Sequence, residues 1–195
     1  MALSSTSGAM HRQLDFYYIC YDNEAYGNTG MQLSAATPYA ARTATSPCSL
    51  QHPAATAQEK KDIFEIWRAH RPPYIATVAP RYPLDLEEKF ARAAAFTGPK
   101  MFLALAACPT GWLYDPGATP EVAKLAVETG LWPLKEAING VVTHTYIPKR
   151  KPVEAYLRLQ GRFRHLFEPT VQADAIRHIQ ERVDAYWTQV AEERA

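Results

Sequence analysis

The chain has 195 residues, of which 21 are basic and 20 acidic, so its formal net charge is +1. This near balance gives no electrostatic reason to expect a nucleic-acid partner or attachment to an anionic membrane. The longest apolar run, Met101–Cys108, is far shorter than the roughly 20 residues that a membrane-spanning helix needs.

Cysteine usage and the N-terminus both indicate the cytoplasm. The three cysteines are an odd number and include no CxxC pair, so they do not form a disulfide framework. No basic segment precedes an apolar core at the N-terminus, and no signal peptide is expected. The length suits one sizeable core, and we predict a single domain over residues 1–195 in a reducing, cytoplasmic compartment.

The first half of the chain alternates between helical and strand patterns. Residues 2–13 are predicted to form a short helix, with Leu3, Met10 and Leu14 available to a core. A strand dense in aromatic and β-branched residues follows at 16–21. The next predicted elements are a helix at 60–70, a strand at 74–78, a helix at 84–97 and a strand at 100–107.

The strand at 100–107 determines the expected fold class. Its near-continuous apolar character is typical of a strand buried on both faces of a parallel sheet. The helix before it has Asp85 and Glu88 as a capping box, with Gly98 at its C-terminal stop. We therefore predict an α/β fold with a central, mostly parallel sheet flanked by helices.

The second half of the chain is predicted to add a hairpin and a helical tail. Thr119 is the expected N-cap of a helix that Gly130 closes. Asn139-Gly140 predicts a hairpin between strands at 131–137 and 141–146. Two further helices are expected at 153–159 and 173–191. The last has apolar residues at helical spacing that fit docking on the body or on a partner: Ile176, Ile179, Val183, Trp187 and Val190.

A polar loop follows the first predicted strand. It holds Asp22, Asn23, Glu24, Asn28, Thr29 and Gln32, with Gly27 and Gly30 allowing close backbone approach. Ligands of open α/β sheets bind at such strand ends, and amide and carbonyl oxygens suit Mg²⁺ with a phosphorylated ligand. The plain alternative is a polar connection without a ligand.

The literal residues of this loop and of two later segments favour a ligand. The segments DNEAYGNTGMQ, CPTGW and YLRLQGRFRHL, at residues 22–32, 108–112 and 156–166, closely resemble the β subunits of 2-oxoacid:ferredoxin oxidoreductases, above all the pyruvate type. The resemblance covers nearly the whole chain. A Gly-Asp-Gly motif, whose aspartate binds the thiamine Mg²⁺ in that family, is absent. The chain is therefore expected to lack the N-terminal half of a thiamine diphosphate-binding domain, as a split or truncated subunit.

The resemblance assigns the loop residues to thiamine diphosphate and Mg²⁺. Asn23 would supply a side-chain oxygen to Mg²⁺, and Ala25 its backbone carbonyl. Asn28 matches an asparagine near the reactive end of the cofactor, and Tyr26 lies in the same cofactor-binding loop. Three alternatives stay open: an Asx-turn role for Asn23, a packing role for Tyr26, and simple solvation of Glu24.

The resemblance assigns Cys108 to a [4Fe–4S] cluster as the last of four thiolate ligands. The other three cysteines are absent, and neither Cys20 nor Cys48 is a credible substitute. Because one thiolate cannot hold such a cluster, another polypeptide would have to complete it. Taken alone, a cysteine after a buried strand is most often a small core residue.

The remaining charged residues carry no recognisable catalytic motif. No two histidines share one element at zinc-site spacing, and we expect all six, including His165, to be surface residues or locally satisfied. Arg162, Arg164 and Lys149–Lys151 are expected to contact a partner subunit.

The function implied by the resemblance is oxidative decarboxylation of a 2-oxoacid such as pyruvate, with coenzyme A and ferredoxin. The chain would act with other subunits and be inactive alone. Two alternatives remain. Another thiamine-dependent decarboxylase is disfavoured by Cys108–Trp112, because such an enzyme needs no cluster ligand. A non-catalytic remnant or interaction subunit is favoured by the missing aspartate and cysteines.

Overall fold

A computed structural model of the chain describes residues 3–194. Backbone contacts divide these residues into two compact units. The sheet unit contains the described residues up to Asp22, together with Asp62–Ala106 and Pro133–Ile147. The loop unit contains Asn23–Lys61, Ala107–Trp132 and the described residues from Pro148 onward. The single domain expected from the sequence stays a prediction.

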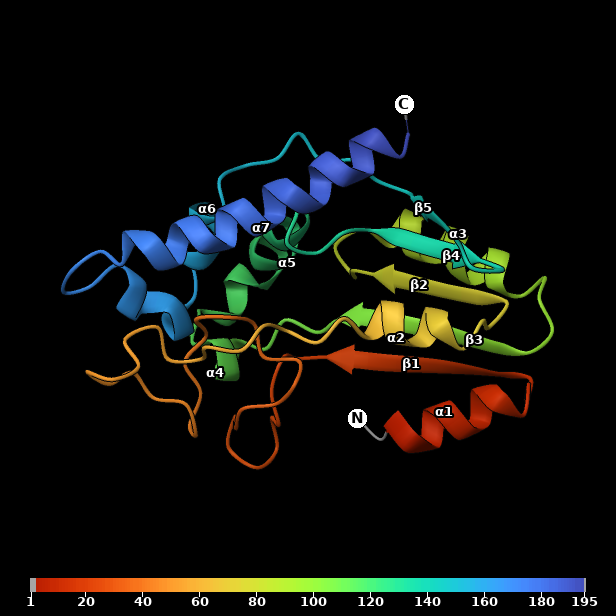
Figure 1. Cartoon of the computed structure of the whole chain (residues 1–195), viewed down its shortest axis with the longest axis horizontal. Coiled ribbons are helices and arrows are strands. Elements are labelled where there is room, and N and C mark those ends of the chain that lie inside the picture. Colours follow the sequence, from red (N-terminus) through yellow and green to blue (C-terminus); the bar gives the residue numbers. More distant parts are fainter. Residues whose placement is uncertain (1–2, 195) are drawn as a thin grey trace. The chain divides into compact units, whose positions relative to one another are not determined.

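The sheet unit is built on five strands in the order β1-β3-β2-β4-β5 (Figure 1). β1 (Phe16–Asp22), β3 (Pro99–Leu105) and β2 (Tyr74–Val78) are parallel neighbours. β4 (Lys135–Ile138) runs antiparallel to β2 and forms a hairpin with β5 (Val141–His144). The predicted α/β fold with a mostly parallel sheet is confirmed.

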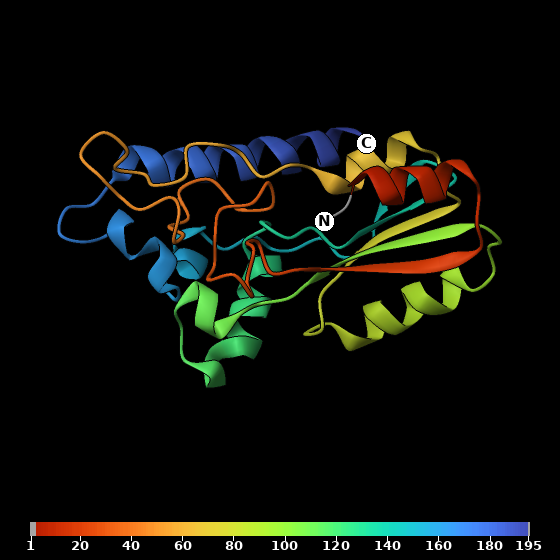
Figure 2. The same ribbon diagram turned by 90° about the horizontal axis from the view of Figure 1, so that it is seen from below.

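Helices cover both faces of this sheet (Figure 2). α1 (Leu3–His11) and α2 (Ile63–Ala69) lie on one face, and α3 (Pro83–Ala93) lies on the other. Every residue of β2 and β3 is buried, as expected for strands enclosed by helices. The face under α3 is aromatic: Phe90 stacks on Phe102 with ring centroids 4.1 Å apart.

Two details of the sheet unit differ from the sequence prediction. Leu14 is 50% exposed and does not join the core, whereas Met10 is fully buried. Asp85 forms no capping box: α3 begins at Pro83, and the Asp85 carboxylate instead lies 2.7 Å from the ammonium of buried Lys89. Lys89 also donates to the Thr77 carbonyl at 2.9 Å, so its buried charge has two partners. A buried ammonium needs a carboxylate more than an exposed helix start does.

The loop unit consists of short helices and one long one. They are α4 (Pro109–Trp112), η1 (Pro116–Ala118), α5 (Thr119–Glu128), α6 (Glu154–Leu157), η2 (Gly161–Leu166) and α7 (Ala173–Glu192). All five apolar residues predicted to face inward from α7 are buried. Thr119 is the first residue of α5 rather than its N-cap, and its hydroxyl donates to the Pro116 carbonyl. Among residues 3–194, no helix is both long enough and apolar enough to cross a membrane.

Gly130 provides a test of how α7 is held against α5. Its φ of +81° matches the +85° of Gly140, but a Cβ at Gly130 would lie 2.3 Å from Trp187 Nε1, whereas one at Gly140 meets nothing within 4 Å. Both alanine variants share a left-handed strain of about 1–2 kcal/mol. We expect Gly130→Ala to lose about 1–3 kcal/mol more than Gly140→Ala, because the indole cannot move aside without leaving its hydrogen bond to the Gly130 carbonyl. Urea denaturation followed by tryptophan fluorescence measures both; equal losses would contradict a tightly seated Trp187.

Candidate functional site

The loop that follows β1 is held in a compact shape by its own backbone. Tyr26 and Gln32 exchange two backbone hydrogen bonds, of 3.0 and 3.2 Å, which close a small hairpin. Gly27 lies inside it, where a Cβ would come within 2.7 Å of Asn23 Nδ2. The glycine therefore leaves room for the Asn23 side chain. We call residues 23–32 the thiamine loop, after the cofactor that the sequence resemblance assigns to it.

Asn23 and Ala25 present oxygen atoms within two residues of each other. Asn23 Oδ1 accepts a hydrogen bond from the Ala25 N–H at 3.3 Å, which is the Asx-turn contact considered from the sequence. That bond is long, and the oxygen retains a second lone pair. Among residues 3–194, no backbone hydrogen bond uses the Ala25 carbonyl. Both oxygens therefore remain available to a hard cation such as Mg²⁺.

Tyr26 and Asn28 lie on the outside of the thiamine loop. The Tyr26 side chain is 53% exposed, so the structure gives it no core-packing role. Asn28 is also exposed, and neither side chain has a hydrogen bond within the described part of the chain. Their position is compatible with contact to a ligand.

Glu24 corrects the sequence interpretation, because it is buried rather than solvated. Only 6% of the residue is exposed, and its carboxylate lies 2.8 Å from Lys60 Nζ and 2.7 Å from Arg162 Nη2. Its carbonyl accepts a 2.7 Å hydrogen bond from the Thr37 hydroxyl. Burial alone would raise the pKa of Glu24, but the charges of Lys60 and Arg162 outweigh it and hold the pKa below its usual value.

Arg162 is likewise an internal residue and not the partner contact that the sequence suggested. It is 3% exposed, and its guanidinium lies over the Trp112 ring, 3.9 Å from the centroid. The Trp112 indole in turn donates a 2.9 Å hydrogen bond to the Asn23 carbonyl. We call Glu24, Lys60, Trp112 and Arg162 the Glu24 cluster. It joins all three segments that carried the family resemblance and fixes the backbone between the two oxygen donors.

Cys108 lies at the start of α4, where its sulfur accepts a 3.4 Å hydrogen bond from the Gly111 N–H. A Cβ at Gly111 would lie 1.9 Å from the Met31 methyl carbon, so the Cys108–Trp112 segment packs directly against the thiamine loop. All three cysteines are free and half-buried. Within the described residues, no group of three or more His, Cys, Asp or Glu side chains could hold a metal ion.

Asn23, Ala25 and Cys108 supply only some of the ligands that Mg²⁺ and a [4Fe–4S] cluster require. Two neutral oxygens suit Mg²⁺, which usually also takes carboxylates and phosphate oxygens. The nearest carboxylate of the thiamine loop, that of Glu24, is occupied by two cations. A lone thiolate at Cys108 supplies one of the four ligands that a [4Fe–4S] cluster takes. The remaining ligands would have to come from outside the described residues.

His165 is satisfied only loosely, by the nearby backbone of Ala54 and Ala40. Both of its ring nitrogens are buried without a hydrogen bond of acceptable geometry. Burial lowers the pKa of His165, and the charge of Arg42 acts in the same direction. Sequence reasoning missed this residue and the Glu24 cluster, although the 156–166 segment that carried the resemblance contains both His165 and Arg162.

Comparison with known proteins defines the class. The family described as "Thiamine pyrophosphate enzyme, C-terminal TPP binding domain" matches residues 1–103, and the chain belongs to it. Thiamine pyrophosphate is another name for thiamine diphosphate. The chain is 46% identical over 173 residues to pyruvate synthase subunit PorB of Methanocaldococcus jannaschii, covering 88% of this chain and 58% of that protein. The predicted resemblance to the oxidoreductase β subunits is thereby confirmed.

Two further comparisons extend this result. Ketoisovalerate oxidoreductase subunit VorB of Pyrococcus horikoshii is 41% identical over 89% of this chain and 56% of its own length. A solved 2-oxoglutarate:ferredoxin oxidoreductase from Magnetococcus marinus has 17% identity and a TM-score of 0.45, over 62% of this chain and 46% of that one. This last likeness is too low to support an inference. The chain spans less than three-fifths of the length of the two relatives named.

Proposed function

We propose that this chain is the thiamine-loop portion of a 2-oxoacid:ferredoxin oxidoreductase that acts on pyruvate. The observation that carries the proposal is the Glu24 cluster, which fixes the backbone between Asn23 and Ala25. Asn23 Oδ1 and the Ala25 carbonyl would bind Mg²⁺, and Asn28 and Tyr26 would contact thiamine diphosphate. When bound, the cofactor would supply a nucleophilic carbon and an electron sink for decarboxylation.

The remaining parts of the proposed reaction need other polypeptides besides this chain. Cys108 would contribute one thiolate to a [4Fe–4S] cluster that passes electrons to ferredoxin, while coenzyme A accepts the acyl group. Other subunits, and a polypeptide equivalent to the N-terminal half, would complete both sites. Pyruvate is favoured over branched 2-oxoacids because four relatives named PorB have 45–48% identity, against 41% for VorB; two further PorB relatives, from Pyrococcus, have 38% and 37%.

Two other functions are compatible with parts of the molecule. A non-catalytic interaction subunit would keep the Glu24 cluster as a structural feature and would not need free oxygens at Asn23 and Ala25. Another thiamine-dependent decarboxylase would use the thiamine loop but leave Cys108 as a helix cap. The binding experiment below separates the first of these from the proposed enzyme.

We expect the isolated chain to bind thiamine diphosphate and Mg²⁺ weakly, and a front-half polypeptide to restore binding. The reason is that Asn23 and Ala25 provide two uncharged oxygens, whereas Mg²⁺ sites normally include a carboxylate. Isothermal titration with and without the front half measures the effect. Micromolar binding by the chain alone would show that another carboxylate of this chain completes the site.

A pair of amide variants serves as the matched control. Asn23→Ala in the reconstituted complex should weaken cofactor binding by about tenfold or more, since one metal oxygen is lost. Gln58→Ala removes an exposed side-chain amide that forms no hydrogen bond within the described residues, and it should leave binding unchanged. Unchanged cofactor affinity in Asn23→Ala would favour the non-catalytic subunit.

A further inference from the structure

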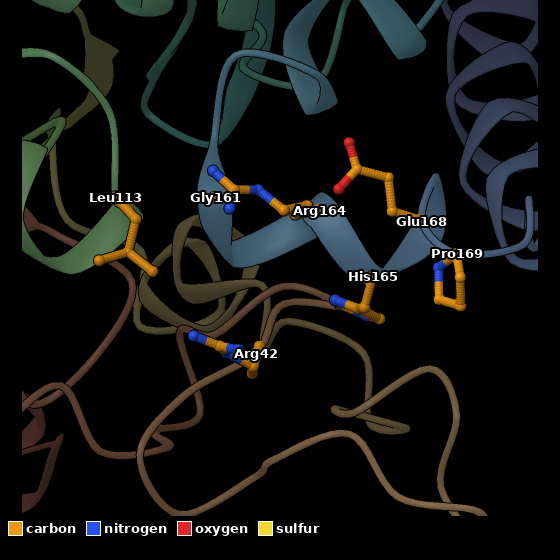
Figure 3. Close-up of a pocket in the computed structure, with 7 residues that line it drawn as sticks. All are labelled: Arg42, Leu113, Gly161, Arg164, His165, Glu168 and Pro169. Carbon is orange, nitrogen blue, oxygen red and sulfur yellow. The ribbon is translucent and has the colours of Figure 1, made fainter.

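A pocket lies in the loop unit, and neither Asn23 nor Ala25 lines it. It has a volume of about 820 Å³, within the roughly 300–1,000 Å³ typical of small-molecule sites. Figure 3 shows the residues that line it, which are Arg42, Leu113, Gly161, Arg164, His165, Glu168 and Pro169. Neither the thiamine loop nor Cys108 contributes to this lining.

The lining carries two arginines without acidic partners. Among residues 3–194, neither Arg42 nor Arg164 forms a side-chain ion pair or hydrogen bond. Glu168 is the one carboxylate in the lining, and it pairs with neither arginine. In Figure 3 its carboxylate extends toward the Arg164 side chain, whereas both guanidinium groups extend toward the side where Leu113 lies. The pocket is therefore lined by two exposed guanidinium groups that form no ion pair within the described residues.

The backbone around these arginines is held in place. The Arg42 N–H donates to the Arg162 carbonyl at 3.0 Å, which ties the Arg42 segment to η2. The Gly161 N–H donates to the Leu113 carbonyl at 2.9 Å, and a Cβ at Gly161 would lie 2.7 Å from Leu113 Cβ. These contacts position the walls of the pocket before any ligand arrives.

His165 adds an imidazole whose ring nitrogens are buried and only loosely contacted by the backbone of Ala54 and Ala40. Its ring nitrogens are buried without an acceptable hydrogen bond, at a position where Arg42 is close enough to lower the histidine pKa. The nearby backbone of Ala54 and Ala40 acts in the opposite direction. An anion beside Arg42 would offset the positive charge and give the imidazole an acceptor.

We infer that this pocket binds the phosphate group of an organic phosphate. Two guanidinium groups and one imidazole supply more donors than the two oxygens of a carboxylate accept, whereas a phosphate dianion has three charged oxygens. Leu113 and Pro169 provide apolar surface for the organic part of the ligand. The inference is independent of the proposed thiamine chemistry, because it uses none of the residues assigned to it.

The test is isothermal titration of the full chain with ADP, inorganic phosphate and adenosine, in the absence of Mg²⁺. We expect ADP to bind, inorganic phosphate to bind more weakly, and adenosine not to bind. Equal affinities for ADP and phosphate would identify the free ion as the ligand and overturn the organic part of the inference. Equal affinities for ADP and adenosine would overturn phosphate recognition altogether.

Arginine variants locate the binding. Arg42→Ala and Arg164→Ala should each weaken ADP binding about tenfold, the loss expected for one charge-assisted hydrogen bond. Arg81→Ala is the matched control, because Arg81 is exposed, forms no ion pair within the described residues and does not line the pocket. Arg164→Lys keeps the charge and should retain part of the affinity for ADP. It replaces Arg164→Ala in the test if the alanine variant fails to fold. Equal affinity in Arg42→Ala, Arg164→Ala and Arg81→Ala would overturn the assignment.

The histidine supplies a readout that the affinity alone does not. ADP should raise the pKa of His165, measured by ring-proton magnetic resonance with His165→Gln to identify the signal. The charged groups facing it in the pocket are Arg42, Arg164 and Glu168. An unchanged His165 titration in the presence of saturating ADP would place the ligand elsewhere.

Discussion

Replacement of Arg162 by alanine should destabilise the loop unit by about 3–5 kcal/mol, the loss typical when one partner of a buried ion pair is removed. The Glu24 carboxylate would stay buried beside Lys60, and the contact of the guanidinium with the Trp112 ring would be lost. Urea denaturation followed by tryptophan fluorescence measures the change. Arg162→Ala should also reduce cofactor binding in the reconstituted complex, because Trp112, which packs against Arg162, holds the Asn23 carbonyl by a hydrogen bond.

Arg177→Ala is the control for this prediction. Arg177 is 63% exposed and pairs with Asp174 on the surface of α7, so its loss should cost under about 1 kcal/mol.

The two variants should also differ in pH dependence. The pKa of Glu24 is lowered in the folded state. Its contribution to the free energy of unfolding is therefore present at pH above the ordinary pKa of glutamate, and it is lost as the pH falls through the folded-state pKa. The deficit of Arg162→Ala should therefore shrink on acidification. A loss as small as that of Arg177→Ala would show that Lys60 alone satisfies Glu24.

The sheet could be predicted from the sequence because its signals are local. β2 has the predicted bounds, Tyr74–Val78, and its five residues are all buried. Asn139 and Gly140 have φ values of 49° and 85°, the left-handed pair that a tight hairpin requires. The sequence also predicts α7, because a long run of apolar residues at helical spacing is typical of an amphipathic helix.

Two sequence predictions were wrong because the role of a residue depends on contacts that its local sequence does not show. Asp85 matched a capping pattern, but its carboxylate is needed by buried Lys89. Leu14 is apolar, yet it lies in the exposed connection before β1. Local sequence does not show which polar group a distant side chain will require.

The candidate site stays a prediction from the resemblance, although the structure brings two of its segments together. The resemblance directed attention to Asn23, Ala25, Tyr26, Asn28 and Cys108, and the structure places the loop and the Cys108 segment in contact through Gly111 and Met31. The Glu24 cluster was missed because its members lie far apart in the sequence, and charged residues are usually exposed. Only the folded chain shows that Glu24 and Arg162 are buried together.

The last expected result concerns Cys108 in a reconstituted, anaerobically prepared complex. Cys108→Ser should lose or distort the [4Fe–4S] signal, whereas Cys20→Ser and Cys48→Ser should keep it. Cys20 lies within β1, paired in register with Leu103, where a ligand role would disturb the sheet. Burial raises the pKa of the Cys48 thiol more than Arg42 lowers it, which disfavours the thiolate that iron requires.

Cys108 differs from both because it follows β3 at the beginning of α4, with the Gly111 N–H directed at its sulfur. Serine retains an acceptor for the same N–H, so Cys108→Ser should keep the start of α4 and nearly the full stability of the chain. Iron content and low-temperature paramagnetic resonance then report the ligand alone, with urea denaturation as the check on folding. A full cluster signal in Cys108→Ser would leave the sulfur as a helix cap, and it would remove the main reason for preferring a ferredoxin-linked enzyme over another thiamine-dependent decarboxylase.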